Sequence, residues 1–523
     1  MAYNTFLYFG LFLGTVYTAW LLSPAKYRPM VLLGASLFFY WLSARQYIVW
    51  ILGAAIVTWV GGLTLARLDE LFADAKPHLQ GGERKAFKGK VGLLKKTVVG
   101  AGAALLLGSL LLLKYSPFFI KSLNSLLARL PGKAVLALPA WVLPLGISFY
   151  TLMAVGYLVD VSRGTVAPAK KLWQVLLYLS FWGHVVEGPF DRYGDVAPAL
   201  LSTSQHPSYR NLTFGAQRIL WGLFKKVVVA DRANTYVAAV FDDFTQYSGM
   251  ATVVGTLLYT LQLYAEFSGC MDIVLGSAEL FGIPLTENFR QPFFSKSVGE
   301  FWRRWHITLG AWLREFLFQP FIMSKPVVKF GRLCREKFGA AAGRNFPVWL
   351  GLILTWVAIG WWHGAGWIFL FYGLYYCALQ LLGQIAEPWL IRAMPQLPEW
   401  RKKGWYQVFQ GVRTFLFVLF GMLLFRSNGM SNALYMLRHL FIPYTESLVI
   451  KVDTRDMAVM VLGAALIVVV DILHERGLHI RERIASRPLP LRWAVYIGGV
   501  VLVMVLGAYG DNYDPAAFIY AQF

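Results

Sequence analysis

Charged residues are scarce in this sequence of 523 residues: only 15% are Asp, Glu, Lys or Arg, against about 25% in an average soluble domain. Apolar residues, in contrast, make up 57% of the chain. This balance excludes a disordered chain, a collagen-like chain and an ordinary soluble enzyme. It favours one polytopic membrane domain, residues 1–523, over several soluble domains.

Cysteine is also rare, with three residues, and each lies in or beside an apolar stretch: Cys270, Cys334 and Cys377. No spacing between them is typical of a disulfide framework or a zinc site. The sequence therefore predicts no metal site and no central thiol chemistry.

Several catalytic motifs are missing from the chain. It has no G-x-S-x-G, no G-x-x-x-x-G-K-[ST], no G-x-G-x-x-G and no H-E-x-x-H. These absences argue against a serine hydrolase, a P-loop ATPase, a dinucleotide enzyme and a zinc protease, respectively.

Apolar runs of membrane-spanning length recur along the chain, and they predict about eleven to thirteen spans. The candidates are residues 3–22, 30–42, 47–66, 97–113, 141–159, 213–230, 251–283, 347–359, 368–382, 408–424, 457–472 and 493–506. A partly apolar stretch at residues 172–186 is a candidate re-entrant segment, which must be buried in protein.

The net charge is +21, which raises the question of nucleic acid, but no nucleic-acid-binding motif is present. Basic loops that contact anionic lipid and orient the spans are the better interpretation. The basic clusters after the first, third and fifth candidate spans all face the cytoplasm if the N-terminus lies outside.

Residues 284–345 form a basic segment with eleven basic and four acidic side chains. Within it, apolar residues spaced by three and four predict one amphipathic helix over residues 298–318. One interpretation is an interfacial helix that rests on lipid headgroups. The density of Trp, Arg and His around Trp305 and His306 suggests a functional site as the alternative.

Two of the eight histidines stand out. His363 lies among glycines and tryptophans in an apolar region, where an ionisable side chain is a functional candidate. His306 lies in the basic segment. Each could instead be a structural histidine that bonds to a neighbouring helix. Without metal-ligand spacing, two membrane histidines suggest proton transfer, so the residues alone leave open an enzyme or a proton-coupled transporter.

Seven motifs in order, over about residues 1–425, resemble those of the membrane-bound O-acyltransferases. The match is to the bacterial branch of alginate and peptidoglycan O-acetyltransferases and teichoic-acid D-alanyl transfer proteins. The motifs are Tyr27-Arg28-Pro29-Met30-Val31-Leu32-Leu33, Leu143-Pro144-Leu145-Gly146-Ile147-Ser148-Phe149-Tyr150, Gly188-Pro189-Phe190-Asp191-Arg192-Tyr193, Phe267-Ser268-Gly269-Cys270-Met271-Asp272, Glu287-Asn288-Phe289, Glu300-Phe301-Trp302-Arg303-Arg304-Trp305-His306 and Trp362-His363-Gly364-Ala365-Gly366-Trp367.

The resemblance implies an all-α polytopic helical bundle, with interfacial or re-entrant helices, around a membrane tunnel. It covers the C-terminal helices of residues 426–523 less well. It implies that His363 is the catalytic residue and that His306 is also required. On this view His363 takes the proton of an acceptor hydroxyl, which attacks a thioester, and His306 orients the acyl group or stabilises the oxyanion. Further pocket candidates are Asn288, Trp302, Arg303, Arg304, Trp305 and Trp362.

The resemblance also implies the reaction partners. We expect no permanently bound cofactor, and a thioester donor that is either acetyl-CoA or an acyl carrier's phosphopantetheine, which the arginines would suit. We expect an extracytoplasmic relay acyltransferase of the SGNH type, contact with membrane lipid, no nucleic acid, and a multi-pass location in the bacterial cytoplasmic membrane.

Two departures bear on the acyl group. Cys270-Met271 stands where alginate-type proteins have Tyr-Ser, and residues 318–323 replace their glycine-rich run. These two features favour D-alanyl transfer. The length of the chain and the motif around His363 favour acetyl transfer, and we predict acetyl transfer to an envelope polysaccharide. The alternatives are D-alanyl transfer to a teichoic-acid-like polymer, a proton-coupled transporter of polymers or lipid-linked sugars, and a noncatalytic scaffold.

Overall fold

The computed structural model describes residues 3, 5, 7–128, 136–139, 143–204, 206–448 and 450–509. The first two residues of candidate span 141–159, positions 4 and 6 of span 3–22, and the end of region 426–523 lie outside these residues. Internal contacts divide the chain into two compact units. Unit 1 comprises Met1–Ala216 with Val274–Thr286, and unit 2 comprises Gln217–Ile273 with Glu287–Phe523. The single-domain expectation stays a prediction.

The described residues are predominantly helical, as predicted, and their only β pairing is one isolated bridge, Phe289–Trp305. The helices of unit 1 are α1 (Gly14–Leu22), α2 (Arg28–Ala44), α3 (Ile48–Ala75), α4 (Gly81–Leu110), α5 (Ser116–Leu127), α6 (Ile147–Arg163), α7 (Leu172–Ser180), α8 (Trp182–Val185) and α9 (Tyr193–Leu200). Two helices contribute to both units: α10 (Tyr209–Leu223) and α12 (Gly249–Leu280).

Unit 2 holds the remaining helices. They are α11 (Asp231–Asp242), α13 (Val298–Arg304), α14 (Ile307–Leu313), α15 (Gln319–Ile322), α16 (Lys325–Phe338), α17 (Ala340–His363), α18 (Trp367–Ala393), α19 (Leu397–Trp400), α20 (Gly404–Arg426), α21 (Met430–Arg438), α22 (Thr454–Glu475), α23 (Ile480–Ala485) and α24 (Leu489–Leu506). A π-helical stretch, η6 (Phe224–Ala230), joins α10 to α11.

Seven helical segments in the described ranges are long and apolar enough to cross a membrane. They are Ala25–His78, Gly81–Leu127, Ala340–His363, Trp367–Ala393, Gly404–Arg426, Thr454–Glu475 and Leu489–Leu506. Eight of the candidate spans fall within them, because Ala25–His78 contains two. The other four candidate spans lie outside these seven segments for local reasons. Candidate 3–22 contains the shorter helical run Leu7–Leu22, and candidate 141–159 contains α6, which has only 17 residues. The helices of candidates 213–230 and 251–283 contain charged side chains.

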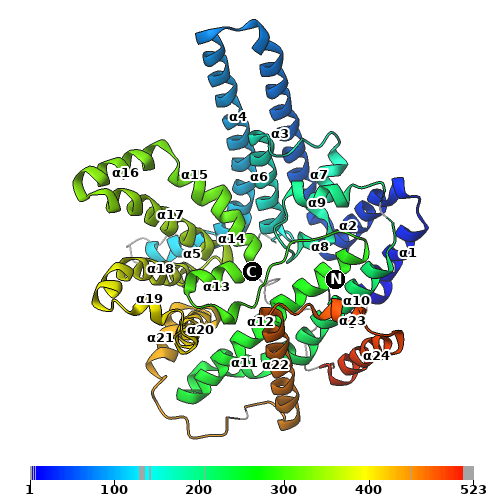
Figure 1. Cartoon of the computed structure of the whole chain (residues 1–523), viewed down its shortest axis with the longest axis vertical. Coiled ribbons are helices and arrows are strands. Elements are labelled where there is room, and N and C mark those ends of the chain that lie inside the picture. The colour runs from blue at the N-terminus through cyan, green and yellow to red at the C-terminus, as the bar shows by residue number, and fades with distance from the viewer. Residues whose placement is uncertain are drawn as a thin grey trace. The chain divides into compact units, whose positions relative to one another are not determined.

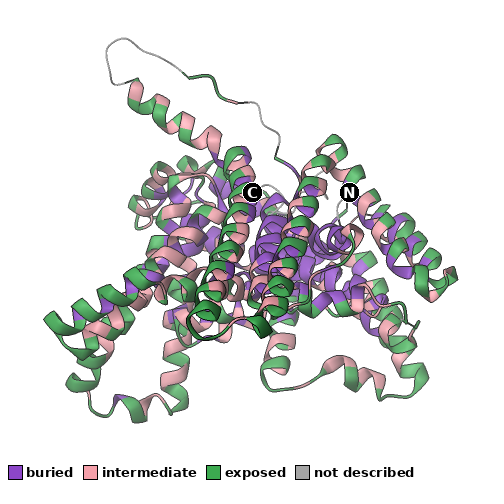
Figure 2. Ribbon diagram, turned by 90° about the horizontal axis from the view of Figure 1, so that it is seen from above, coloured by how far each residue is buried: buried purple, intermediate pink, exposed green. Residues whose placement is uncertain are grey.

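Large apolar side chains remain exposed along several of these segments, where exposed residues are green in Figure 2. Examples are Leu462 on α22 and Val505 on α24, each 72% exposed. Contiguous apolar exposure of this kind marks surfaces that contact a nonaqueous partner, which for a membrane protein is lipid.

In unit 1, α6 is the most buried long helix, and it packs on the antiparallel pair α3 and α4, which Figure 1 shows side by side. Glycines make this packing close. A Cβ atom on Gly62 would lie 2.8 Å from the Tyr157 hydroxyl, and one on Gly102 would lie 2.7 Å from a Leu158 methyl group. The candidate re-entrant stretch forms α7 and α8, which break at Phe181 and are buried from Val175 to Val185.

In unit 2, the hairpin of α16 and α17 (Figure 1) is followed by α18, which packs on α17. Helix α22 lies C-terminal to the seven sequence motifs, and ion pairs hold it at both ends. Asp456 near its start pairs with Arg232 at 2.8 Å, and Glu475 at its end pairs with Arg304 at 2.7 Å. Helix α22 is therefore bound within the same unit as the two histidines.

Candidate active site

His363 is the last residue of α17, and the residue is 2% exposed. Aromatic rings surround it: the ring centroids of Trp362, Tyr372 and Phe425 lie 5.0, 5.9 and 5.3 Å from that of His363. Tyr372 comes from α18 and Phe425 from α20. The imidazole therefore lies where three helices meet, in an apolar and nearly dry environment.

Glycines bring α17 and α18 into backbone contact beside this site. A Cβ atom on Gly373 would lie 2.3 Å from the Trp356 carbonyl oxygen, and one on Gly360 would lie 2.5 Å from the Phe369 carbonyl oxygen. Since real Cβ atoms do not approach so closely, any larger residue must push the helices apart. The glycines thus set the position of His363 relative to Tyr372.

Replacing Gly373 with alanine is expected to lower the free energy of unfolding by about 1–3 kcal/mol, the usual cost of overpacking. The matched control is Gly383→Ala on the same helix, where nothing lies within 4 Å of the added Cβ atom. Thermal unfolding of the two variants in nanodiscs tests this. Equal midpoints would contradict the close packing of α17 and α18.

His306 lies in a turn between α13 and α14 and has left-handed backbone angles, φ 50° and ψ 51°. The prediction of one amphipathic helix over residues 298–318 is therefore wrong. The cause is pairing with a distant segment: the Arg290 N–H donates to the Arg304 carbonyl at 2.9 Å, and the Ile307 N–H donates to the Asn288 carbonyl at 3.0 Å. These bonds occupy groups that a continuous helix would use internally.

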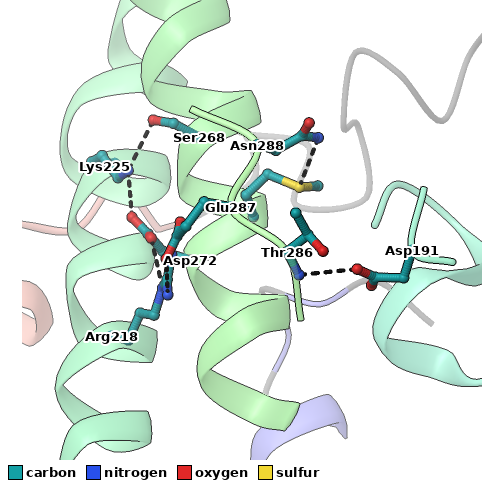
Figure 3. A network of polar contacts seen from close by, with 9 residues as sticks. Asp191, Arg218, Lys225, Ser268, Asp272, Thr286, Glu287 and Asn288 are labelled. Carbon is teal, nitrogen blue, oxygen red and sulfur yellow. Dashed lines mark hydrogen bonds and ion pairs between the residues drawn. The ribbon is translucent and has the colours of Figure 1, made fainter. Parts of the chain in front are cut away.

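The Asn288 side chain adds to this pairing and is itself 1% exposed. Its Oδ1 atom accepts hydrogen bonds from the backbone N–H and the hydroxyl of Thr308, at 3.1 and 2.9 Å. It also lies 3.3 Å from Nδ1 of His306. On its other side, the Asn288 amide donates to the sulfur of Met271 at 3.4 Å (Figure 3). Asn288 therefore holds the His306 turn.

One indole contacts both histidines. The centroid of the Trp362 ring lies 5.5 Å from that of His306 and 5.0 Å from that of His363. Phe267 covers another side of His306, with ring centroids 5.0 Å apart. The two histidines, 57 positions apart in the sequence, thus belong to one buried aromatic cluster.

Burial lowers the pKa of His306 from its ordinary value to about 3, because desolvation disfavours the imidazolium. The ring is therefore neutral at physiological pH. A neutral imidazole has one N–H donor and one acceptor nitrogen.

The other candidate residues divide into two groups. Trp302 packs on Tyr376 and Tyr372, at 4.9 and 6.3 Å between centroids, and so adjoins the rings around His363. Trp305 instead packs against Phe289 and other rings of a neighbouring aromatic layer.

The two arginines also differ. Arg304 pairs with Glu475 and, at 2.8 Å, with Glu300, whereas Arg303 is exposed. Of the two, Arg303 is the one whose guanidinium is presented at the surface.

A partly buried ion network was not predicted from the sequence (Figure 3). Asp272 accepts from Arg218 at 3.0 Å and pairs with Lys225 at 2.5 Å, and Arg218 also binds Glu287 through two bonds. Glu287 directly precedes Asn288, so the network anchors the segment that holds His306. The available signal was the pair Lys225-Lys226 inside an otherwise apolar run.

Tyr372 and Phe425 were also missed. In the sequence they are ordinary aromatic members of apolar spans, and nothing in their spacing marks them. Only the packing of α17, α18 and α20 brings them to His363.

No group of three His, Cys, Asp or Glu side chains suited to a metal ion occurs within the part of the chain that the structure describes.

Comparison with known proteins gives a consistent result. Residues 169–333 match the sequence model of the membrane-bound O-acyltransferase family. The matched range contains Asn288 and His306, and His363 lies beyond it. The chain is 30% identical over 438 residues to the probable alginate O-acetylase of Azotobacter vinelandii, covering 83% of this chain and 76% of that protein.

Two further relatives have other acceptors in their names. The peptidoglycan O-acetyltransferase of Helicobacter pylori is 28% identical over 354 residues, covering 62% of this chain and 61% of the relative. The teichoic acid D-alanyltransferase of Bacillus subtilis is 27% identical over 282 residues, covering 54% of this chain and 68% of the relative.

Proposed function

The chain belongs to the membrane-bound O-acyltransferase family, and from this premise we propose that it moves an acetyl group from a cytoplasmic thioester to a hydroxyl group of an extracytoplasmic polysaccharide or cell-wall polymer. The chain is a multi-pass membrane protein and an O-acyltransferase. The acetyl group, the thioester and the acceptor are the proposal. The observation that carries it is the contact of both His306 and His363 with Trp362 inside one buried cluster.

In the proposed reaction, the imidazole of His363 accepts the proton of the acceptor hydroxyl. The hydroxyl oxygen attacks the thioester carbonyl, a carbon–oxygen bond forms, and the carbon–sulfur bond breaks. The proton then passes from His363 to the thiolate, which leaves as a thiol, so that protons and charge balance. Burial supports this role, because a dry site strengthens the hydrogen bonds to the reacting groups and limits competing hydrolysis.

The donor is proposed to be acetyl-CoA or an acyl carrier's phosphopantetheine. Arg303 is the better placed arginine for its phosphate groups, since the Arg304 guanidinium is held by Glu475 and Glu300. Trp302 and Trp362 are proposed to line the acyl pocket. A separate extracytoplasmic acyltransferase of the SGNH type is proposed to relay the group, in a bacterial cytoplasmic membrane.

D-alanyl transfer is the second candidate. Its support is the similarity to the teichoic acid D-alanyltransferase of Bacillus subtilis. Acetyl transfer is preferred because the alignment with the alginate O-acetylase covers 83% of this chain, against 54% for that relative.

The donor can be tested with purified protein in nanodiscs, supplied separately with radiolabelled acetyl-CoA and a D-alanyl carrier protein. We expect release and transfer of acetyl groups only, measured with and without an SGNH-type relay protein and a polysaccharide acceptor. Turnover of the D-alanyl carrier alone would replace acetyl transfer with the second candidate. No turnover of either donor with the relay present would overturn the proposed function.

A further inference from the structure

The orientation of the Asn288 amide is determined by its surroundings. Its Oδ1 position is 3.1 Å from the backbone N–H of Thr308, which can only donate. The atom there must accept, so it is the oxygen and not the amide nitrogen. The nitrogen on the opposite side donates to the sulfur of Met271.

This orientation has a consequence for His306. Its Nδ1 atom lies 3.3 Å from the same Oδ1 atom. An amide oxygen has no proton to give, so Nδ1 must carry the proton in this bond. In a neutral imidazole the other nitrogen, Nε2, then carries a lone pair and can only accept.

The backbone makes this arrangement rigid. The Asn288 carbonyl accepts from Ile307, so Asn288 is bonded to the residues on both sides of the left-handed turn at His306. Phe267 and Trp362 contact the ring. The imidazole therefore has little freedom to turn over and exchange the places of Nδ1 and Nε2.

We propose that Asn288 is a positioning residue that holds His306 in the Nδ1–H tautomer, so that Nε2 presents a hydrogen-bond acceptor to the substrate. The hydroxyl group that is to be acylated has one proton, which passes to His363, so the partner of Nε2 is a second donor of the substrate, a neighbouring hydroxyl or an amide N–H. Through this bond His306 positions the substrate, and it does not donate to a developing oxyanion. This inference rests on the proposed acyl transfer and specifies which substrate group His306 binds.

Nitrogen-15 NMR of histidine-labelled wild-type protein in nanodiscs tests the tautomer directly, with the His306→Gln variant identifying the His306 signals. We expect a protonated Nδ1 and an unprotonated Nε2 at pH 7. A protonated Nε2 with an unprotonated Nδ1, or a doubly protonated ring, would overturn the proposal. This measurement needs no turnover, so it decides the tautomer even if the proposed function fails.

Enzyme kinetics test the positioning role. Asn288→Leu removes the acceptor and is expected to lower kcat by about 10- to 100-fold, with KM changed by less than about threefold. Asn288→Asp keeps an acceptor oxygen and adds a negative charge, which raises the pKa of the neighbouring imidazole. Its kcat above pH 8 should stay within about threefold of wild type, while His306, followed by nitrogen-15 NMR, should protonate at a pH at least about one unit higher than in the wild type.

Asn234→Asp is the matched control, because Asn234 bonds to Gln262 at 3.0 Å in a partly buried amide pair. The protonation of His306 in this variant should match that of the wild type. An unshifted protonation of His306 in Asn288→Asp, or equal losses of kcat in Asn288→Leu and Asn288→Asp at every pH, would overturn the positioning role. Loss of turnover in the wild type itself would instead count against the proposed function.

Discussion

Replacing His363 with glutamine is expected to lower kcat for acyl transfer by about 10²- to 10⁴-fold, the usual contribution of a positioned general base. Glutamine fills similar space among Trp362, Tyr372 and Phe425, and it can still form hydrogen bonds, but it cannot take up the hydroxyl proton near neutral pH. KM for the thioester should change little, because the lost interaction belongs to the transition state. Initial rates in nanodiscs give both parameters.

His439→Gln is the control for this substitution. His439 follows α21 and has no proposed role in catalysis. Its ring stacks on Tyr435, with ring centroids 3.9 Å apart. Its rate should stay within about twofold of wild type. Full turnover by His363→Gln, with an unchanged unfolding midpoint, would remove His363 from the chemistry and leave the acceptor role of His306 as the only proton site to consider.

The sequence was informative wherever a local pattern determined the structure. The helical class follows from apolar runs, and eight candidate spans lie within the seven segments of spanning length. His306, His363 and Trp362 were singled out because their residue types are unusual in an apolar context, and the structure brings these three together. Their catalytic roles remain proposals.

The failures have a common physical cause, which is contact between distant segments. The amphipathic pattern of residues 298–318 favours a continuous helix, but pairing with residues 288–290 breaks it at His306. Likewise, α12 carries Glu266 and Asp272 in the middle of an apolar helix because their partners, Lys226 and Lys225, come from η6. The hydropathy of a local stretch of sequence carries no information about the distant segment that pairs with it.

The largest stability effect is expected at Asp272, the centre of the partly buried ion network. Asp272→Asn keeps the shape of the side chain but removes the charge that faces both Arg218 and Lys225. Lys225 has only 6% of its side chain exposed, so the variant leaves an uncompensated charge in a poorly solvated site. Breaking such a pair by removing one partner typically costs roughly 3–5 kcal/mol.

The comparison that isolates this burial is Glu70→Gln, which removes the partner of Arg67 in an ion pair whose side chains are 68% and 63% exposed. Water screens that pair, so its loss should change the free energy of unfolding by less than about 1 kcal/mol. Unfolding of both variants in mixed micelles by titration with sodium dodecyl sulfate gives the two values. If Asp272→Asn costs no more than Glu70→Gln, the network contributes no more than a surface pair. If it costs the expected amount, the network is the anchor of the Glu287-Asn288 segment, and kcat should fall in parallel because the His306 turn depends on that segment.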